Sequence, residues 1–158
     1  MRNKTALMLA VASSLILALL LELIPLHPEL NPWRPPWLLV VVVFWVLHLP
    51  GSVGIGTAWS AGLVMDVVNG APLGSHALVF TLAGVLTLAA RRLLLAFSVL
   101  QQALWVAALG LMQYGILSLL LPSTAISGLV STMLTAALLW TLLQLLFYRR
   151  IQGRFQIE

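Results

Sequence analysis

The sequence contains no cysteine among its 158 residues. Disulfide bonds, thiolate metal sites and cysteine nucleophiles are therefore excluded, and the redox compartment is left undetermined. Charged residues are also scarce, at 8% of the chain compared with about 25% in soluble domains. Because so few charges cannot cover the surface of a 17.2 kDa globule, the composition excludes a soluble enzyme, a large extramembrane domain and a disordered tail.

Apolar residues make up most of the remainder, at 61% of the chain with a mean hydropathy of +1.07. A membrane helix needs about 20 residues, so the chain has room for five or six spans. The apolar runs between Pro and Gly breakers predict six spans, at about 5–24, 36–50, 53–69, 74–90, 96–121 and 126–148. We therefore expect an all-α polytopic membrane protein, a six-helix bundle that forms a single domain over residues 1–158. The second and third spans are short for the hydrocarbon core, and the sequence leaves open whether they cross it fully.

The basic residues predict the orientation of these spans. If the N-terminus is cytoplasmic, the outside loops contain a single basic residue, Arg34. The inside segments then contain Arg2, Lys4, Arg91, Arg92, Arg149, Arg150 and Arg154. Short inside loops of membrane proteins carry such an excess of Lys and Arg. We expect a multi-pass protein of the cell inner membrane with both termini in the cytoplasm, and the net charge of +4 is no argument for nucleic-acid binding.

Asp66 is the one acid within the central predicted spans. Gly54, Ala58, Gly62, Asp66 and Gly70 recur at steps of four residues, which is typical of a helix face that another helix approaches closely. A carboxylate at membrane depth is costly unless it faces protein or water and has a partner. We therefore expect Asp66 to lie between two helices and not to face lipid.

Arg34 is the predicted partner of Asp66. Folding the second and third spans back on each other about Gly51 places position 34 opposite position 68, which favours an Arg34–Asp66 ion pair with His76 nearby. The alternative is that each group is separately solvated at the headgroup level. Glu22 and Glu29 are expected to be solvated groups at helix ends.

Two further sets of polar and aromatic residues are candidates for contacts. Trp33 and Trp37 flank a Pro-rich segment and are expected to anchor the chain at the membrane interface, with docking of a partner protein as the alternative. Gln102 is expected to tie its helix to a neighbour through its amide.

The sequence offers no set of residues for catalysis, metal binding or cofactor binding. His27, His48 and His76 share no ligand spacing, and Gly54-Ile55-Gly56 opens no strand-turn-helix unit for a dinucleotide. We therefore expect a protein without enzymatic activity, cofactor or metal.

Several segments together carry a family resemblance. They are RPPWLLV at 34–40, WVLHLP at 45–50, VGIGT at 53–57, GLVMDVVNGAPLGSHAL at 62–78 and QQAL at 101–104. In these segments the chain resembles the bacterial rod shape-determining MreD family in its Gram-negative form. The resemblance implies a non-catalytic inner-membrane scaffold of the rod, or elongation, complex that helps control cell shape and lateral peptidoglycan synthesis. It implies binding of MreC, a single-span protein, and indirect links to MreB, RodA and its penicillin-binding transpeptidase, with membrane lipids around the bundle.

The same family is similar in fold to the six-helix substrate-binding subunits of energy-coupling vitamin transporters. This similarity leaves a second function open, that of a membrane subunit binding a small molecule of the vitamin type. Asp66, His76, Glu22 and Gln113 would then supply polar groups to a pocket. The sequence does not determine the oligomeric state, because a glycine stripe serves packing within one chain and between two copies equally well.

Overall fold

The computed structural model describes residues 2–27, 29–30, 33–120 and 128–155, and these contain seven α-helices and no strand. The helices are α1 (Arg2–Leu23), α2 (Trp37–His48), α3 (Ile55–Asn69), α4 (Ser75–Ala89), α5 (Arg91–Ala96), α6 (Val99–Leu120) and α7 (Gly128–Phe155). Each predicted span corresponds to one helix. The predicted count of six is nevertheless wrong, because a seventh helix, α5, occupies the connection between the fourth and fifth spans. Nothing between Ala90 and Phe97 breaks a helix, so this connection forms one short extra element.

Three helices are long and apolar enough to cross a membrane, over Thr5–Leu23, Val99–Leu120 and Leu129–Leu146. α2 and α4 are shorter apolar helices. α2 has 12 residues and is about 18 Å long, which is well below the thickness of about 30 Å of a hydrocarbon core. The expectation of a short second span is therefore confirmed.

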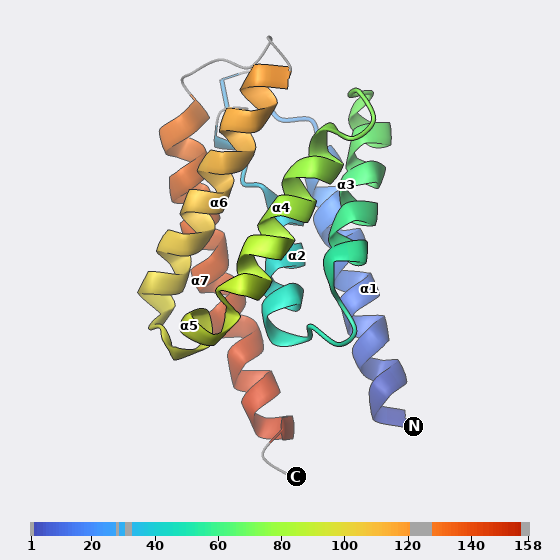
Figure 1. Cartoon of the computed structure of the whole chain (residues 1–158), viewed down its shortest axis with the longest axis vertical. Helices are drawn as coiled ribbons and strands as arrows, with labels where there is room; N and C mark the ends of the chain where they lie inside the picture. Colours follow the sequence, from blue (N-terminus) through green and yellow to red (C-terminus); the bar gives the residue numbers. More distant parts are fainter. Residues whose placement is uncertain (1, 28, 31–32, 121–127, 156–158) are drawn as a thin grey trace.

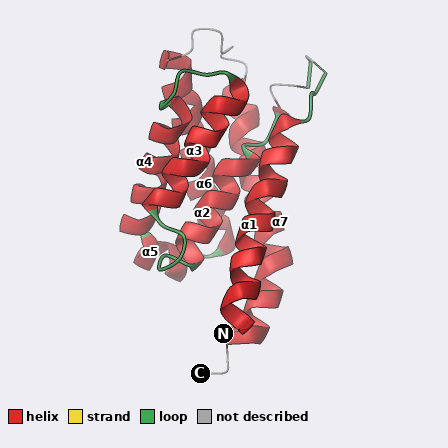
Figure 2. Ribbon diagram, turned by 90° about the vertical axis from the view of Figure 1, so that its right-hand side faces the viewer, coloured by secondary structure: helices red, strands yellow, loops and turns green. Residues whose placement is uncertain are grey.

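α2 forms the centre of the bundle and contacts each of the other six helices. Every residue from Leu38 to Leu47 is buried. The sequence of α2 is apolar on all sides, as expected of a helix enclosed by protein. Around it, α3 pairs with α4 and α6 pairs with α7, while α1 packs mainly on α2. Figure 2 shows the α3–α4 pair on one side of α2, with α1 and α7 on the opposite side.

The two ends of the bundle differ in charge. The start of α1, the short helix α5 and the end of α7 lie at the same end of the bundle, the lower end in Figure 1. We term this end of the molecule the basic end. These segments contain seven of the eight Lys and Arg residues. The eighth, Arg34, belongs to the connection between α1 and α2 at the opposite end, which also carries Glu22, Glu29 and Asp66. The start of α1 and the end of α7 therefore lie on the same side, as the charge distribution predicts.

Candidate functional site

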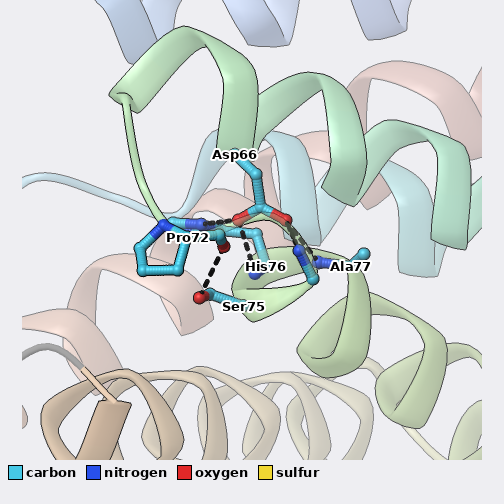
Figure 3. A network of polar contacts seen from close by, with 6 residues as sticks. Asp66, Pro72, Ser75, His76 and Ala77 are labelled. Carbon is cyan, nitrogen blue, oxygen red and sulfur yellow. Dashed lines mark hydrogen bonds and ion pairs between the residues drawn. The ribbon is translucent and has the colours of Figure 1, made fainter.

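The most extensive polar network joins the end of α3 to the start of α4 (Figure 3). Asp66 is completely buried there. Its Oδ1 accepts hydrogen bonds of 2.8 Å from the backbone N–H and from Nδ1 of His76. Its Oδ2 accepts hydrogen bonds from the backbone N–H groups of Gly74, at 2.8 Å, and Ala77, at 3.4 Å. The carboxylate thereby caps the N-terminus of α4, where backbone N–H groups lack partners within the helix and the dipole favours negative charge.

The close approach of α3 and α4 makes this network possible. A Cβ atom at Gly62 would lie 2.4 Å from Cα of Ala77 and 2.7 Å from the carbonyl oxygen of His76, so only glycine fits at this position. Ala58 and Asp66, four residues to either side, are fully buried. The predicted seam along this face of α3 is therefore confirmed.

The two ends of the glycine stripe have a different role. Gly54 is the N-cap of α3 and Gly70 is its C-cap, so neither lies within the seam. Gly70 has a φ of +60°, in the left-handed region that glycine adopts without the steric cost of a side chain. The turn at Gly70 reverses the chain and allows Gly74 and His76 to reach Asp66.

The predicted Arg34–Asp66 ion pair is wrong. The Arg34 guanidinium donates a hydrogen bond to the carbonyl oxygen of Ile24 and interacts electrostatically with Glu22. Both oxygens of Asp66 are occupied by α4 and by the turn that precedes it. The prediction assumed that the second and third spans form the closest hairpin, whereas α3 packs mainly on α4. The predicted proximity of His76 to Asp66 is confirmed.

Glu22 is a second buried carboxylate, and the expectation that it is solvated is wrong. Only 8% of its surface is exposed, and its Oε2 accepts a hydrogen bond of 3.2 Å from the backbone N–H of Leu38. Pro36, the N-cap of α2, has no side-chain donor or acceptor, so Glu22 satisfies part of this helix end in its place. The shared signal for both buried acids is a carboxylate in the last turn of one helix, followed by a turn rich in Pro or Gly and the start of another helix. Glu29 is exposed as expected.

A basic side chain holds the other end of α2. Arg91 Nε donates a hydrogen bond of 2.9 Å to the carbonyl oxygen of Leu47, in the last turn of α2. The central helix α2 thus has an acidic side chain at its N-terminus and a basic side chain at its C-terminus, and each charge interacts favourably with the helix dipole.

The remaining candidate residues lie in separate places. Gln102 is buried, donates from Nε2 to the carbonyl oxygen of Leu94 at 2.8 Å, and accepts from Gln144 Nε2 at 2.6 Å. It therefore ties α6 to α5 and α7, as predicted for its amide. Trp33 is 55% exposed beside the start of α2, and Trp37 is half-buried.

The role of Glu22 predicts a measurable loss of stability. Replacing Glu22 by Ala leaves the Leu38 N–H without this acceptor and removes the negative charge that interacts with Arg34, so we expect the free energy of unfolding in detergent to fall by about 1–2 kcal/mol. Glu22→Gln keeps one acceptor oxygen, so its loss of stability is expected to be less than half of the loss in Glu22→Ala. Thermal unfolding followed by circular dichroism measures both, with the exposed Glu29→Ala as the control. Equal melting temperatures for Glu22→Ala and Glu29→Ala would contradict the capping role.

The chemistry of these groups points to structure. Among the described residues, no group of three or more His, Asp or Glu side chains is arranged to hold a metal ion. The buried carboxylates bind helix ends of their own chain, and the buried amides bind each other and the backbone. The fold and the site therefore define a helical membrane protein whose intramembrane polar side chains hold its helices together.

Comparison with known proteins identifies the family. A sequence model described as the rod shape-determining protein MreD matches residues 2–152, and the chain belongs to this MreD family. The chain is also similar to the rod shape-determining protein MreD of Haemophilus influenzae, with 38% identity over 71 residues. This alignment covers 45% of the chain and 44% of that relative, so the match spans less than half of the relative's length. No solved structure matches the chain. The family and the apolar helices together support a membrane protein with a role in rod shape determination.

Proposed function

We propose that this chain is a non-catalytic, multi-pass scaffold of the inner membrane that binds an MreC-like single-span protein. Through that partner it would be linked to MreB, to RodA and to the penicillin-binding transpeptidase that acts with RodA, and so help control lateral peptidoglycan synthesis. The family match over residues 2–152 carries this proposal. The charge distribution supports an orientation with the basic end in the cytoplasm.

α1 is the proposed docking helix for the single span of the partner. It is buried along one stripe that faces α2, which includes Val11, Ala18 and Glu22. Of the residues in its apolar membrane-spanning stretch, only 17% are buried, compared with 33% in α6 and 28% in α7. Its opposite side exposes Leu9, Ile16, Leu17 and Leu20, each by more than half. An unpartnered helix at the margin of a bundle can accept a further helix by van der Waals packing without disturbing the core.

Trp33 extends this proposal beyond the membrane core. It is exposed at the end of the molecule where α1 ends, beside Arg34. Trp and Arg are the residues that most often dominate binding energy at protein interfaces. We therefore propose that Trp33 contacts the partner protein just beyond the partner's span, at the end of the bundle opposite the basic end.

The buried acids favour the scaffold over the alternative of a vitamin-binding transporter subunit. Transporters commonly use the N-termini of short, interrupted helices to bind anionic groups of their substrates. Here the N-termini of the short helices α2 and α4 are occupied by Glu22 and Asp66 of the chain itself. The transporter function stays a prediction that co-purification of a stoichiometric small molecule would support.

Cross-linking in the native membrane tests the docking helix, because the chain has no cysteine of its own. A single Leu17→Cys on the exposed side of α1 is expected to form a cross-link with a cysteine in the partner's span. Val11→Cys, which is 6% exposed and faces α2, is the matched control and is expected to give at most about a tenth of that yield. Cross-links confined to exposed positions of α3 or α6 would move the interface away from α1. Affinity purification that recovers no MreC-like protein would overturn the scaffold function itself.

A further inference from the structure

α5 has one side attached to the bundle and one side without a partner. On the attached side, Leu94 is 1% exposed and Arg91 binds the carbonyl oxygen of Leu47. The carbonyl oxygens of Leu94 and Phe97 accept hydrogen bonds from Gln102. These contacts fix the position of the helix at the basic end (Figure 1).

The free side of α5 combines a single cation with large apolar side chains. Leu93, Leu95 and Phe97 are 63%, 48% and 39% exposed. Arg92 is exposed and, within the part of the chain that the structure describes, has neither a hydrogen-bond nor an ion-pair partner. The three acids among the described residues belong to the opposite end, so none of these three neutralises Arg92.

The apolar side chains of α5 stand directly before a candidate membrane span. The span of α6 begins at Val99, two residues after Phe97. Leu100 and Leu104, in the first turns of that span, are 72% and 63% exposed. The chain connection therefore places α5 at one end of a membrane-crossing helix, the level at which the phosphate groups of the lipids begin.

We propose that the free side of α5 binds the headgroup of an anionic phospholipid. Arg92 contacts the phosphate, and Leu93, Leu95 and Phe97 lie between the upper parts of the acyl chains. Guanidinium groups bind phosphate through paired hydrogen bonds, and basic residues at the membrane surface favour anionic lipids. A lipid suits this surface better than a soluble acidic protein does, because the cation stands among large exposed apolar side chains directly before the membrane span of α6.

Lipid retention by the purified protein tests the site. Native mass spectrometry compares phosphatidylglycerol with phosphatidylcholine of the same acyl chains. We expect the unmodified protein to retain phosphatidylglycerol about fivefold better, and Arg92→Gln to lose most of this preference. Lys4→Gln removes one positive charge elsewhere at the same end and is expected to keep it. Arg92→Lys is expected to keep part of it.

Three results would overturn the proposal. They are equal retention of the two lipids by the unmodified protein, an equal loss of preference in Arg92→Gln and Lys4→Gln, and loss of the preference when inorganic phosphate is added. The last result would identify a site for free anions, and the second would show a diffuse charge effect.

A fluorescent label tests the apolar half of the site independently of Arg92. Leu95→Cys is labelled with an environment-sensitive fluorophore and reconstituted into phosphatidylglycerol vesicles. The label is expected to emit at a shorter wavelength than the free fluorophore does in buffer. A lipid-borne quencher is expected to quench it. Glu29→Cys, in an exposed turn at the opposite end, is the control that should respond less. A label at position 95 that a water-soluble quencher reaches as easily as the label at position 29 would show that α5 does not lie among lipids.

Discussion

Gly62→Ala is expected to prevent the α3–α4 pair from forming and to yield little folded protein. The added Cβ would lie 2.4 Å from Cα and 2.6 Å from the backbone nitrogen of Ala77. Neither atom belongs to a flexible side chain, so the two helices must separate. Overpacking of a core usually costs about 1–3 kcal/mol, and a contact with backbone on both sides of the interface is expected to exceed that range. The measurement is the fraction of monodisperse protein in detergent, together with its melting temperature.

Gly56→Ala is the matched control in the same helix. A Cβ at Gly56 meets no atom within 4 Å, and alanine favours a helix over glycine by up to about 1 kcal/mol. This variant is therefore expected to be as stable as the unmodified protein or slightly more stable. If Gly62→Ala and Gly56→Ala behaved alike, the close approach of α3 to α4 at Gly62 would be refuted.

Asp66→Ala is expected to produce the second large loss, about 3–5 kcal/mol of stability. The change removes the acceptor for three backbone N–H groups, those of Gly74, His76 and Ala77, and for the His76 ring. Water cannot readily replace the lost oxygen atoms at His76 and Ala77, because Asp66 is fully buried and these residues are 6% and 1% exposed. We expect a lower melting temperature and faster amide hydrogen exchange in the first turn of α4.

Further variants of Asp66 and His76 separate the contributions of charge and of hydrogen bonding in this network. Asp66→Asn keeps one acceptor oxygen without the negative charge, so its loss of stability should fall between those of Asp66→Ala and the unmodified protein. His76→Ala keeps the backbone N–H bonds and removes the ring contact, so it should cost less than Asp66→Ala. Asp66→Ala with an unchanged melting temperature would show that α4 does not depend on this carboxylate. If such a variant also retained its MreC-like partner, Asp66 would have no part in the scaffold.

The residues that sequence reasoning placed correctly share a local signal. The stripe through Ala58, Gly62 and Asp66 indicated a helix seam because small residues at steps of four let another helix approach closely. The amide of Gln102 on an apolar helix indicated a bond to another helix for a similar reason. In both cases the sequence predicted that a contact exists, and the structure supplied its partner, α4 for the stripe and Gln144 for the amide.

The errors concerned the choice of partner. Pairing neighbouring spans predicts Arg34 as the partner of Asp66, whereas α3 packs mainly on α4. A position near a helix end predicts a solvated Glu22, whereas its side chain is buried. Neither prediction could take into account that α2 occupies the centre of the bundle, with its N-terminus beside Glu22 and its C-terminus beside Arg91.

The sequence by itself determined that the protein is a helical membrane protein, where its long apolar helices lie, and that its basic residues gather at one end. These properties depend on the length and spacing of apolar runs and on the position of charges along the chain, which need no knowledge of distant contacts. The tertiary structure alone decided which helix is central and which group each buried carboxylate binds. The reason is that a helix end without partners accepts whichever acid lies nearest, and the nearest acid is fixed by the packing of whole helices, such as the contact that Gly62 permits between α3 and α4.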